Sequence, residues 1–353
     1  MSAAPAGSED ASLPLVEVSV IVPCRNEARA IEAFIGEVMG QDFHRDAFEV
    51  IVADGMSDDG TREILSRLGA HFRNLRMIDN PRGAVSPGLN AAIAEARGDI
   101  IVRMDVHASY APDYLSRCVE LLRQGVADNV GGAARTRAEG RFQCANALAY
   151  ASWFSVGGAR FHTPDYEGYV DTVTFGCWYR CKLIELGMFD EELVRNQDDE
   201  LNLRTILAGG RIYQSASIRC WYHPRSSWIS LFRQYMQYGY WKVRVIQKHR
   251  AVASWRHLVP VTVLVIGILL LLAAPFSSAA SALLLAGLAS YLVCSLAVSA
   301  RIATKARSLD SFPLLPGAFA AYHFGYAIGF ARGILAFVVR RKLNHSSMQT
   351  LTR

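Results

Sequence analysis

The sequence predicts an α/β fold in which a mixed, mainly parallel sheet with flanking helices precedes a transmembrane helical hairpin. Two observations indicate this. Strand-like and helix-like patterns alternate from residue 16 onward, and two long uncharged apolar runs in the last third of the chain are flanked by basic residues. Strand–helix alternation is typical of parallel sheets with helices on both faces.

Four short apolar segments are expected to be strands of one sheet. They cover residues 18–23, 48–53, 75–78 and 100–102. Pro23, Asp54 and Asp105 each fall at or just beyond the end of such a strand. Because ligands of parallel α/β sheets bind beyond the carboxyl ends of the strands, these three residues are expected to lie at a ligand site.

Charge is distributed unevenly along the 353 residues, although the formal net charge is only +5. Up to Glu200 there are 19 basic and 31 acidic residues, a balance of −12; beyond it there are 18 basic residues and one acidic residue, a balance of +17. A basic half indicates nucleic acid or an anionic membrane surface as a partner. Here the basic residues surround apolar runs, which favours the membrane and argues against nucleic acid.

Cysteines and the N-terminus point to the cytosolic side of a membrane. The seven cysteines are scattered, without a CxxC pair, so we expect reduced and mostly buried thiols. Residues 1–15 are small, polar and acidic, and they lack the basic-then-apolar pattern of a signal peptide. We expect a disordered leader there.

The segment from Asp99 to His107 carries the central metal hypothesis. Side chains two positions apart in an extended backbone lie on the same face, so Asp105 and His107 are candidates to share one divalent cation. A loop-capping pair is the alternative. The chain contains neither GxGxxG nor GxxxxGK[ST], so a glycine-rich phosphate cradle is missing. A cation on Asp105 and His107, together with basic side chains, would then hold a nucleoside diphosphate.

Three motifs in this order resemble family 2 glycosyltransferases of the GT-A (nucleotide-diphospho-sugar transferase) fold. They are VSVIVPCRNE (18–27), VADGMSDDGT (52–61) and RMDVH (103–107), and the resemblance extends over residues 16–241. Within the family, the chain is most similar to membrane-bound exopolysaccharide glucosyltransferases of the succinoglycan type. Those enzymes transfer glucose from UDP-glucose to a sugar linked to polyprenyl diphosphate.

The resemblance implies donor-binding roles for residues of the first two strand ends and the loop after the third. Pro23, Arg25 and Glu27 would lie along the nucleoside, and Asp54 would accept a hydrogen bond from the uracil imide. A turn carboxylate that caps the next helix is the alternative for Asp54. Arg82 would approach the pyrophosphate, or else be a solvated loop arginine.

The resemblance also implies a metal site. The family motif is Asp-x-Asp, and in this chain Asp105 stands at its first position and His107 at its last. Either Mn²⁺ or Mg²⁺ would serve as cofactor, and imidazole suits Mn²⁺ better. His223 stands where relatives carry a metal- or phosphate-contacting histidine; a structural loop histidine is the alternative.

The acceptor side is expected in the middle of the chain. The run at 196–204 resembles the family's Glu-Asp-x-Asp-Leu-x-x-Arg motif, which implies that Asp198 is the general base. Asp199 and Glu200 would position the acceptor or cap the helix. Trp178 would stack on a sugar ring, with a core tryptophan as the alternative.

The chain after the leader is divided into a catalytic domain and three membrane-associated parts. A catalytic domain at 16–225 is followed by an amphipathic interface helix or linker at 226–257, a transmembrane hairpin at 258–300, and membrane-associated or re-entrant helices with a basic tail at 301–353. The helix at 226–257 would lie in the interface or close over the donor. We expect a helix pair broken near Pro313 and Pro316. Basic flanks on both sides of the hairpin predict a multi-pass inner-membrane protein with a cytoplasmic catalytic domain.

Taken together, these features predict an inverting glycosyltransferase. It would move a hexose, with glucose favoured, from a UDP-sugar to a polyprenyl-diphosphate-linked acceptor in exopolysaccharide or cell-surface glycan synthesis, alongside other polysaccharide-assembly enzymes. The alternative is a non-catalytic membrane scaffold that binds a nucleotide sugar within an assembly complex. The carboxyl groups of Asp105 and Asp198 favour the enzyme.

Overall fold

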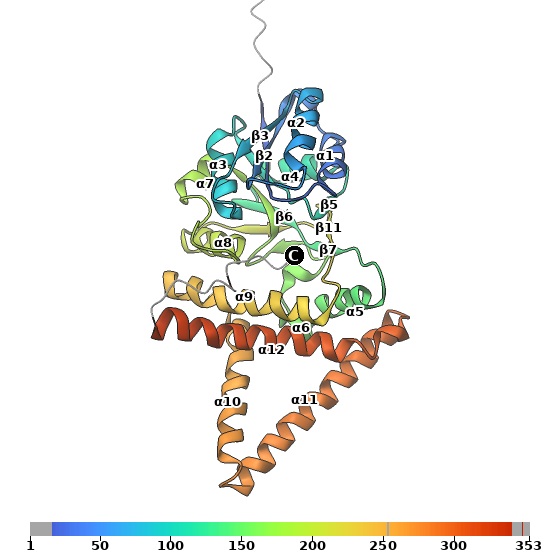
Figure 1. Ribbon diagram of the computed structural model, residues 1–353, viewed down its shortest axis with the longest axis vertical. Helices are drawn as coiled ribbons and strands as arrows, with labels where there is room; N and C mark the ends of the chain where they lie inside the picture. Colours follow the sequence, from blue (N-terminus) through green and yellow to red (C-terminus); the bar gives the residue numbers. More distant parts are fainter. Residues whose placement is uncertain (1–15, 253, 341–347, 349–353) are drawn as a thin grey trace, which may run out of the picture.

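The computed structural model describes residues 16–252, 254–340 and 348. The predicted leader and most of the basic tail lie outside these residues. Figure 1 shows three parts stacked along the long axis: an α/β domain, a layer of two long helices, and a pair of helices that diverge from a common tip.

The α/β domain is built on a large mixed sheet. Within the described residues it contains eight strands in the order β3-β2-β1-β4-β9-β6-β10-β8. The strands are β1 (Val18–Cys24), β2 (Phe48–Asp54), β3 (Leu75–Asp79), β4 (Ile100–Arg103), β6 (Asn129–Gly132), β8 (Gly168–Tyr169), β9 (Thr174–Tyr179) and β10 (Ile212–Gln214). The first four are parallel, β9 runs antiparallel between β4 and β6, and β10 is parallel to β6. This mixed sheet with flanking helices confirms the predicted fold class.

A small second sheet lies beside the large one, towards the helical layer. It has the strand order β5-β11-β7, with β5 at Ala108–Tyr110, β7 at Ala134–Thr136 and β11 at Cys220–Tyr222. Strand β11 pairs antiparallel with β5 and parallel with β7. The chain between β4 and β5 carries Asp105 and His107, so this pairing fixes the loop after the fourth strand.

Helices cover both faces of the large sheet, because the strands carry apolar side chains on both faces. Along β1, Val20 and Val22 belong to one apolar core, whereas Ile21 between them belongs to the other. This alternation has the period of two that a strand imposes. The helices of the domain are α1 (Ile31–Met39), α2 (Thr61–His71), α3 (Val85–Glu95), α4 (Tyr114–Arg123), α5 (Arg141–Tyr150), α6 (Trp153–Val156), α7 (Arg180–Glu185) and α8 (Gln197–Leu207).

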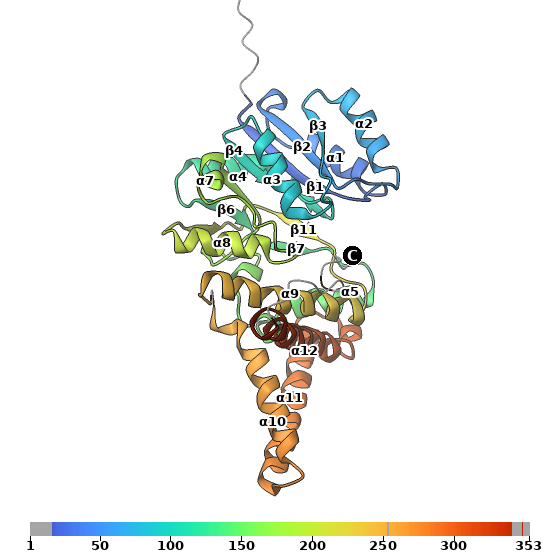
Figure 2. The same cartoon turned by 60° about the vertical axis from the view of Figure 1, so that its left-hand side comes forward.

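The helical layer consists of α9 (Trp228–His249) and α12 (Leu315–Gly333), which lie side by side in both views (Figures 1 and 2). Gly325, Gly329 and Gly333 recur every four residues on the side of α12 that contacts α9. A Cβ atom at Gly325 would lie 2.8 Å from the carbonyl oxygen of Phe232, and one at Gly333 would lie 2.6 Å from that of Tyr240. Small residues at this spacing let the two helix backbones touch.

This contact makes a substitution at Gly329 destabilising. In Gly329→Ala the new methyl group would overlap the carbonyl oxygen of Met236, so the helices must separate. Forced overpacking of this kind costs about 1–3 kcal/mol, and the melting temperature in detergent should fall. Gly267→Ala is the matched control, because a Cβ there meets no atom within 4 Å and alanine favours a helix over glycine. Equal melting of the two variants would contradict the close approach.

The diverging pair consists of α10 (Val259–Ala273) and α11 (Ser278–Lys305). Three helical stretches are long and apolar enough to cross a membrane: Trp255–Ala273, Ser278–Lys305 and Leu315–Val339. Only 6% of the first two is buried inside the protein, against 44% of the third. Figure 1 shows α12 lying across the axes of α10 and α11, against α9. Most of the exposed apolar surface of these three stretches therefore belongs to α10 and α11.

The predicted break in the 312–339 region is wrong. Helix α12 runs without interruption to Gly333 and continues as a π-helical segment, Ile334–Val339. Pro316 stands in the first turn of α12, where a missing N–H costs nothing. The glycines that suggested a break are those that contact α9. Short 3₁₀ turns occupy Arg45–Ala47, Arg160–His162, Trp255–His257 and Leu309–Ser311.

Candidate active site

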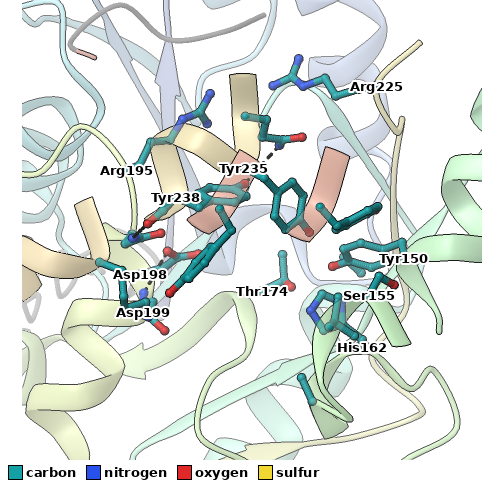
Figure 3. Close-up of a pocket in the computed structure, with 18 of the residues that line it drawn as sticks. Tyr150, Ser155, His162, Thr174, Arg195, Asp198, Asp199, Arg225, Tyr235 and Tyr238 are labelled. Carbon is teal, nitrogen blue, oxygen red and sulfur yellow. Dashed lines mark hydrogen bonds and ion pairs between the residues drawn. The ribbon is translucent and has the colours of Figure 1, made fainter. Parts of the chain in front are cut away.

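One continuous cavity of about 2440 Å³ joins the carboxyl edge of the sheet to the helical pair. Its sheet end is lined by Pro23, Arg25 and Asp105, its middle by Asp198 and other polar residues, and its hairpin end by apolar residues of α10 and α11. Figure 3 shows the middle, with Asp198 and Asp199 on one wall and Tyr150, Ser155 and His162 on the other.

The loop after β1 is held in place by the loop after β2. The backbone N–H of Asn26 donates to Ser57 Oγ at 2.7 Å, and that of Glu27 donates to Thr61 Oγ1 at 2.7 Å. Asn26 adopts a left-handed conformation with φ 55°, which turns the chain sharply after the strand. Arg25 and Glu27 thereby line the cavity; their contacts with a nucleoside stay a prediction.

Asp54 is placed differently from the prediction. Its side chain is fully buried and accepts hydrogen bonds from the Ser57 N–H at 3.0 Å, from Ser57 Oγ at 2.5 Å and from Arg62 Nη1 at 2.7 Å. It is absent from the cavity lining. The predicted contact with a base is therefore wrong, and the turn-capping alternative describes what is seen. Asp54 acts on the site indirectly, because Ser57 in turn holds Asn26.

Asp105 lines the sheet end and is paired with an arginine from the same strand face. Arg103 donates from Nε to Asp105 Oδ1 at 2.9 Å and from Nη2 to Asp105 Oδ2 at 2.8 Å. Arg103 is buried, whereas the Asp105 side chain is 28% exposed. Burial alone would lower the pKa of Arg103, but Asp105 raises it above its usual range. The arginine therefore stays charged between Asp105 and Asp198.

The predicted three-ligand metal set is not assembled. His107 Nε2 lies 2.8 Å from Glu27 Oε1, and Asp105 is engaged by Arg103. His223 lines the cavity from the end of β11, but within the described ranges no three His, Cys, Asp or Glu side chains group closely enough to hold a metal. A site of fewer protein ligands still fits. A carboxylate has about four lone-pair positions, so the two contacts with Arg103 leave Asp105 able to bind a cation that a diphosphate also holds.

Arg82 stands at the rim of the sheet end. Its side chain is exposed, lines the cavity and forms an ion pair with Glu191. Asn90 donates to the other oxygen of Glu191 at 2.9 Å, which anchors this carboxylate to α3. An arginine at the mouth of the cavity is positioned to meet a phosphate, whose charge would compete with that of Glu191.

Asp198 and Asp199 open helix α8. The residue before the helix, Asn196, has φ 63° and donates from Nδ2 to the carbonyl oxygen of Tyr238 at 2.9 Å, so the start of α8 is fastened to α9. The Asp199 N–H donates to Asp198 Oδ1 at 2.9 Å. Burial raises the pKa of Asp198; nearby Arg103 opposes this, and the charge of Asp199 adds to it.

Asp199 is held by a lysine from the helical layer. Burial would raise the pKa of Asp199, but its ion pair with Lys242 keeps that pKa below the usual range. Both residues line the cavity. Asp199 therefore stays negatively charged next to Asp198, and this charge contributes to the raised pKa of Asp198.

Two predicted acceptor contacts are wrong. Trp178 is 1% exposed, and its ring packs edge-on against Phe189 with centroids 6.1 Å apart, so it is a core tryptophan. Glu200 is also fully buried; it lies 2.7 Å from Arg204 Nε and 2.7 Å from His249 Nε2. Glu200 pins α8 to α9 and does not reach the cavity.

Several polar residues of the cavity were not assigned to the site from the sequence. Arg195, Arg225 and Lys242 line its middle, and Arg103 lies between the two key carboxyl groups. Arg103 could have been found, because it stands two residues before Asp105 and strand side chains alternate. Lys242 forms an ion pair with Asp199, which lies 43 residues earlier in the chain. No local sequence pattern predicts a contact at that separation.

The arrangement defines a class of protein. A mixed sheet carries a carboxylate at the end of β4, and a second, more basic carboxyl group faces the same cavity from the start of α8. This is the GT-A architecture of a sugar transferase. Comparisons with known proteins identify the family.

The chain belongs to glycosyltransferase family 2. The model of the family described as glycosyl transferase family 2 matches residues 19–190. The succinoglycan biosynthesis protein ExoA of Rhizobium meliloti (strain 1021) is 34% identical over 246 residues, which cover 69% of this chain and 74% of that protein. These similarities confirm the predicted family, the predicted relative and the assignment as a glycosyltransferase.

Two further comparisons agree. The dolichyl N-acetyl-α-D-glucosaminyl phosphate 3-β-D-2,3-diacetamido-2,3-dideoxy-β-D-glucuronosyltransferase of Methanococcus voltae is 27% identical over 240 residues, which cover 65% of this chain and 74% of that enzyme. A solved mannosyltransferase from Pyrobaculum calidifontis, in complex with GDP-Man and Mn²⁺, has a TM-score of 0.59 at 22% identity, covering 88% of this chain and 86% of that one. The latter likeness shows the GT-A fold.

Proposed function

We propose that the protein is an inverting, divalent-cation-dependent glycosyltransferase that moves a hexose, with glucose favoured, from a UDP-sugar to a lipid-linked glycan acceptor. The observation that carries this proposal is that Asp105 and Asp198 line one cavity, with Arg103 close to both. The cavity continues to the apolar helices, where a lipid-linked acceptor would arrive.

The donor would occupy the sheet end. Pro23, Arg25 and Glu27 would lie along the nucleoside, while Arg82 and Asp105 would face the diphosphate. A divalent cation, Mn²⁺ or Mg²⁺, held by Asp105 with His107 beside it, would neutralise charge on the departing diphosphate. Arg103 fixes the orientation of the Asp105 carboxylate through two hydrogen bonds.

Asp198 would act as the general base. As the acceptor oxygen attacks C1 of the sugar, its proton passes to a carboxylate oxygen of Asp198, the C1–O bond breaks, and UDP leaves with the electron pair. Attack from the face opposite the diphosphate inverts the anomeric centre. An elevated pKa makes Asp198 a stronger base than an exposed aspartate, which favours proton transfer near neutral pH.

The relatives support a lipid-linked acceptor. ExoA is named for succinoglycan biosynthesis, and the Methanococcus relative acts on a dolichyl-linked sugar phosphate. An undecaprenyl-phosphate 4-deoxy-4-formamido-L-arabinose transferase of Aeromonas hydrophila is 28% identical over 130 residues. The mannosyltransferase bound to Mn²⁺ supports a divalent cation. Preference for UDP-glucose comes from the resemblance to succinoglycan-type enzymes.

The proposed location is the cytoplasmic face of the inner membrane. Helices α10 and α11 would span the bilayer as a hairpin, because Lys242, Arg244 and Lys248 precede α10 and Arg301 and Lys305 end α11. Basic flanks on both sides keep both ends cytoplasmic. Helix α12 would then lie along the membrane surface beneath α9, as its orientation across the hairpin favours.

The direct test is transfer by purified protein in proteoliposomes. With Mn²⁺, a panel of radiolabelled UDP-sugars and a polyprenyl-diphosphate-linked sugar, we expect incorporation from UDP-glucose and a β-linked product by NMR. Binding of UDP-sugar without transfer or hydrolysis, under conditions where ExoA is active, would show the scaffold function instead.

The pH dependence of kcat/KM should depend on the charge of Asp199 next to the proposed base, Asp198. Because burial and Asp199 raise the pKa of Asp198, kcat/KM should fall as the pH drops through a pKa above the usual value of about 3.9 for aspartate. Asp199→Asn removes the neighbouring negative charge, so the pKa of Asp198 should fall and the acidic limb should move to lower pH. A pH–rate profile of both proteins checks this; a limb that moves to higher pH, or not at all, contradicts the coupling.

A further inference from the structure

We propose that the lipid chain of the acceptor binds in the groove between α10 and α11, with its phosphate groups at Arg225, Lys242 and Arg256. This inference rests on the proposed function, since it presumes a lipid-linked acceptor. It adds the binding site of the lipid, the depth to which the lipid enters and the side chains that meet its head.

The groove is formed by facing apolar stripes. Val263, Gly267 and Leu271 recur every four residues on α10, and all three line the cavity that reaches Asp198. Leu284 and Leu288, also spaced by four, line it from α11. Residues at this spacing lie on one face of a helix. The two helices therefore turn apolar faces towards one shared space.

Glycines keep this space open. Gly267 on α10 and Gly287 on α11 both line the cavity, and a Cβ atom at either position would meet no atom within 4 Å. The glycines of α12 are different, because they contact α9 directly. Open space therefore adjoins both hairpin glycines, and a flexible hydrocarbon chain matches the apolar lining around them.

The length of the groove between α10 and α11 is comparable to the thickness of a membrane. Helix α10 has 15 residues, or about 22 Å at 1.5 Å per residue, against a hydrocarbon core of roughly 30 Å. A polyprenyl chain that lies along α10 would stay within the hydrocarbon core of the bilayer over the length of this helix. Its head group would meet the catalytic domain at the end of α10 nearest to α9.

Cations collect at that end. Lys242 of α9 and Arg256, just before α10, line the cavity between the apolar groove and Asp198, and Arg225 lines it from the loop after β11. Burial lowers the pKa of Arg225, and the charge of the nearby Arg195 lowers it further. The ion pairs of Lys242 and Arg256 are made with Asp199 and Asp171. A diphosphate would form charge-assisted hydrogen bonds with cations of this kind.

The order of groups along the cavity therefore matches the order of groups in such an acceptor. Apolar chain, phosphates and sugar would meet the groove, the cations and Asp198 in turn. A second copy of the hairpin, or ordinary phospholipid acyl chains, would also fill an apolar groove. A phospholipid also carries a phosphate next to its acyl chains, but it has no sugar beyond that phosphate to meet Asp198, and a second hairpin has neither group.

Narrowing the groove provides the first test. In Gly287→Leu the new side chain enters the open groove, so KM for an acceptor with a full-length polyprenyl chain should rise about tenfold, as for the loss of roughly two buried methylene groups. KM for an acceptor with a two-isoprene chain should not change. Ala289→Leu, an exposed position on the same helix that lies outside the cavity lining, is the matched control. Equal KM values for the long acceptor in all three proteins would overturn the proposal.

Photocrosslinking provides a test that does not need transfer. A polyprenyl diphosphate with a diazirine in its chain should label α10 and α11 of the wild-type protein in nanodiscs, and unlabelled polyprenyl diphosphate should compete whereas phospholipid should not. Arg225→Gln should weaken this competition, and Gly287→Leu should reduce the labelling. Labelling that phospholipid displaces, or crosslinks between two hairpins in its place, overturns the site. Labelling without any transfer would leave the lipid site standing and count against the proposed function alone.

Discussion

Asp198→Asn is expected to lower kcat by about 10²–10⁴-fold, the range that general base catalysis contributes. The substitution keeps the size of the side chain and its ability to accept the Asp199 N–H, but the amide cannot take a proton from the acceptor hydroxyl group. Arg103 remains paired with Asp105, so the fold and the donor end should be unaffected.

The measurement is steady-state transfer from UDP-sugar to lipid-linked acceptor, together with the affinity for UDP by calorimetry. We expect kcat to fall while the dissociation constant for UDP stays within about twofold, since Asp198 is expected to face the acceptor. Asp190→Asn is the control, because this carboxylate pairs with Lys248 outside the cavity lining. Undiminished transfer by Asp198→Asn would remove the assignment of the base.

Asp105→Asn should produce the other large loss. A metal that stabilises charge on a leaving diphosphate contributes several kcal/mol, so kcat/KM should fall by about 10²-fold or more. Asparagine fills the same space, and its Oδ1 can accept one of the two hydrogen bonds that Arg103 donates to Asp105. Asp198 remains as a nearby carboxyl group for the buried guanidinium.

The decisive readout is binding of Mn²⁺, followed by its electron paramagnetic resonance signal. With UDP present, the wild-type protein should bind one Mn²⁺ tightly, and Asp105→Asn should bind it weakly. Chelation by EDTA should abolish transfer by the wild-type protein, and Mn²⁺ should restore it. Asp46→Asn, which changes an exposed carboxylate outside the cavity lining, should behave as the wild type. Tight Mn²⁺ binding by Asp105→Asn would contradict the metal assignment.

The sequence predicted the sheet edge well because it depends on local patterns. Apolar runs of strand length were read correctly, and each ended where a loop had to begin, so Pro23 and Asp105 were found at the cavity. Asp198 was placed by its motif, and the structure puts it on the same cavity as Asp105. The period of two in a strand would also have identified Arg103, had it been applied backwards from Asp105.

The sequence did not predict which of the candidate site residues are buried. Asp54, Trp178 and Glu200 have the right chemistry for a site, but each is turned inward by contacts with residues distant in the chain or on the next turn. A tryptophan in a short strand gives no sign of which face is covered. Glu200 contacts His249, which lies 49 residues later in the chain. Such contacts depend on tertiary packing, which neither spacing nor composition encodes.

The connection between α8 and α9 has a consequence for the size of the product. Asn196, Asp199 and Glu200 at the start of α8 are tied respectively to Tyr238, Lys242 and His249 of α9, and α9 packs against α12 at backbone contact. If α12 rests on the bilayer, Asp198 is held at a constant height above it. On the proposed function, only a sugar at that height would be extended, so the number of residues already on the acceptor would decide whether it is a substrate.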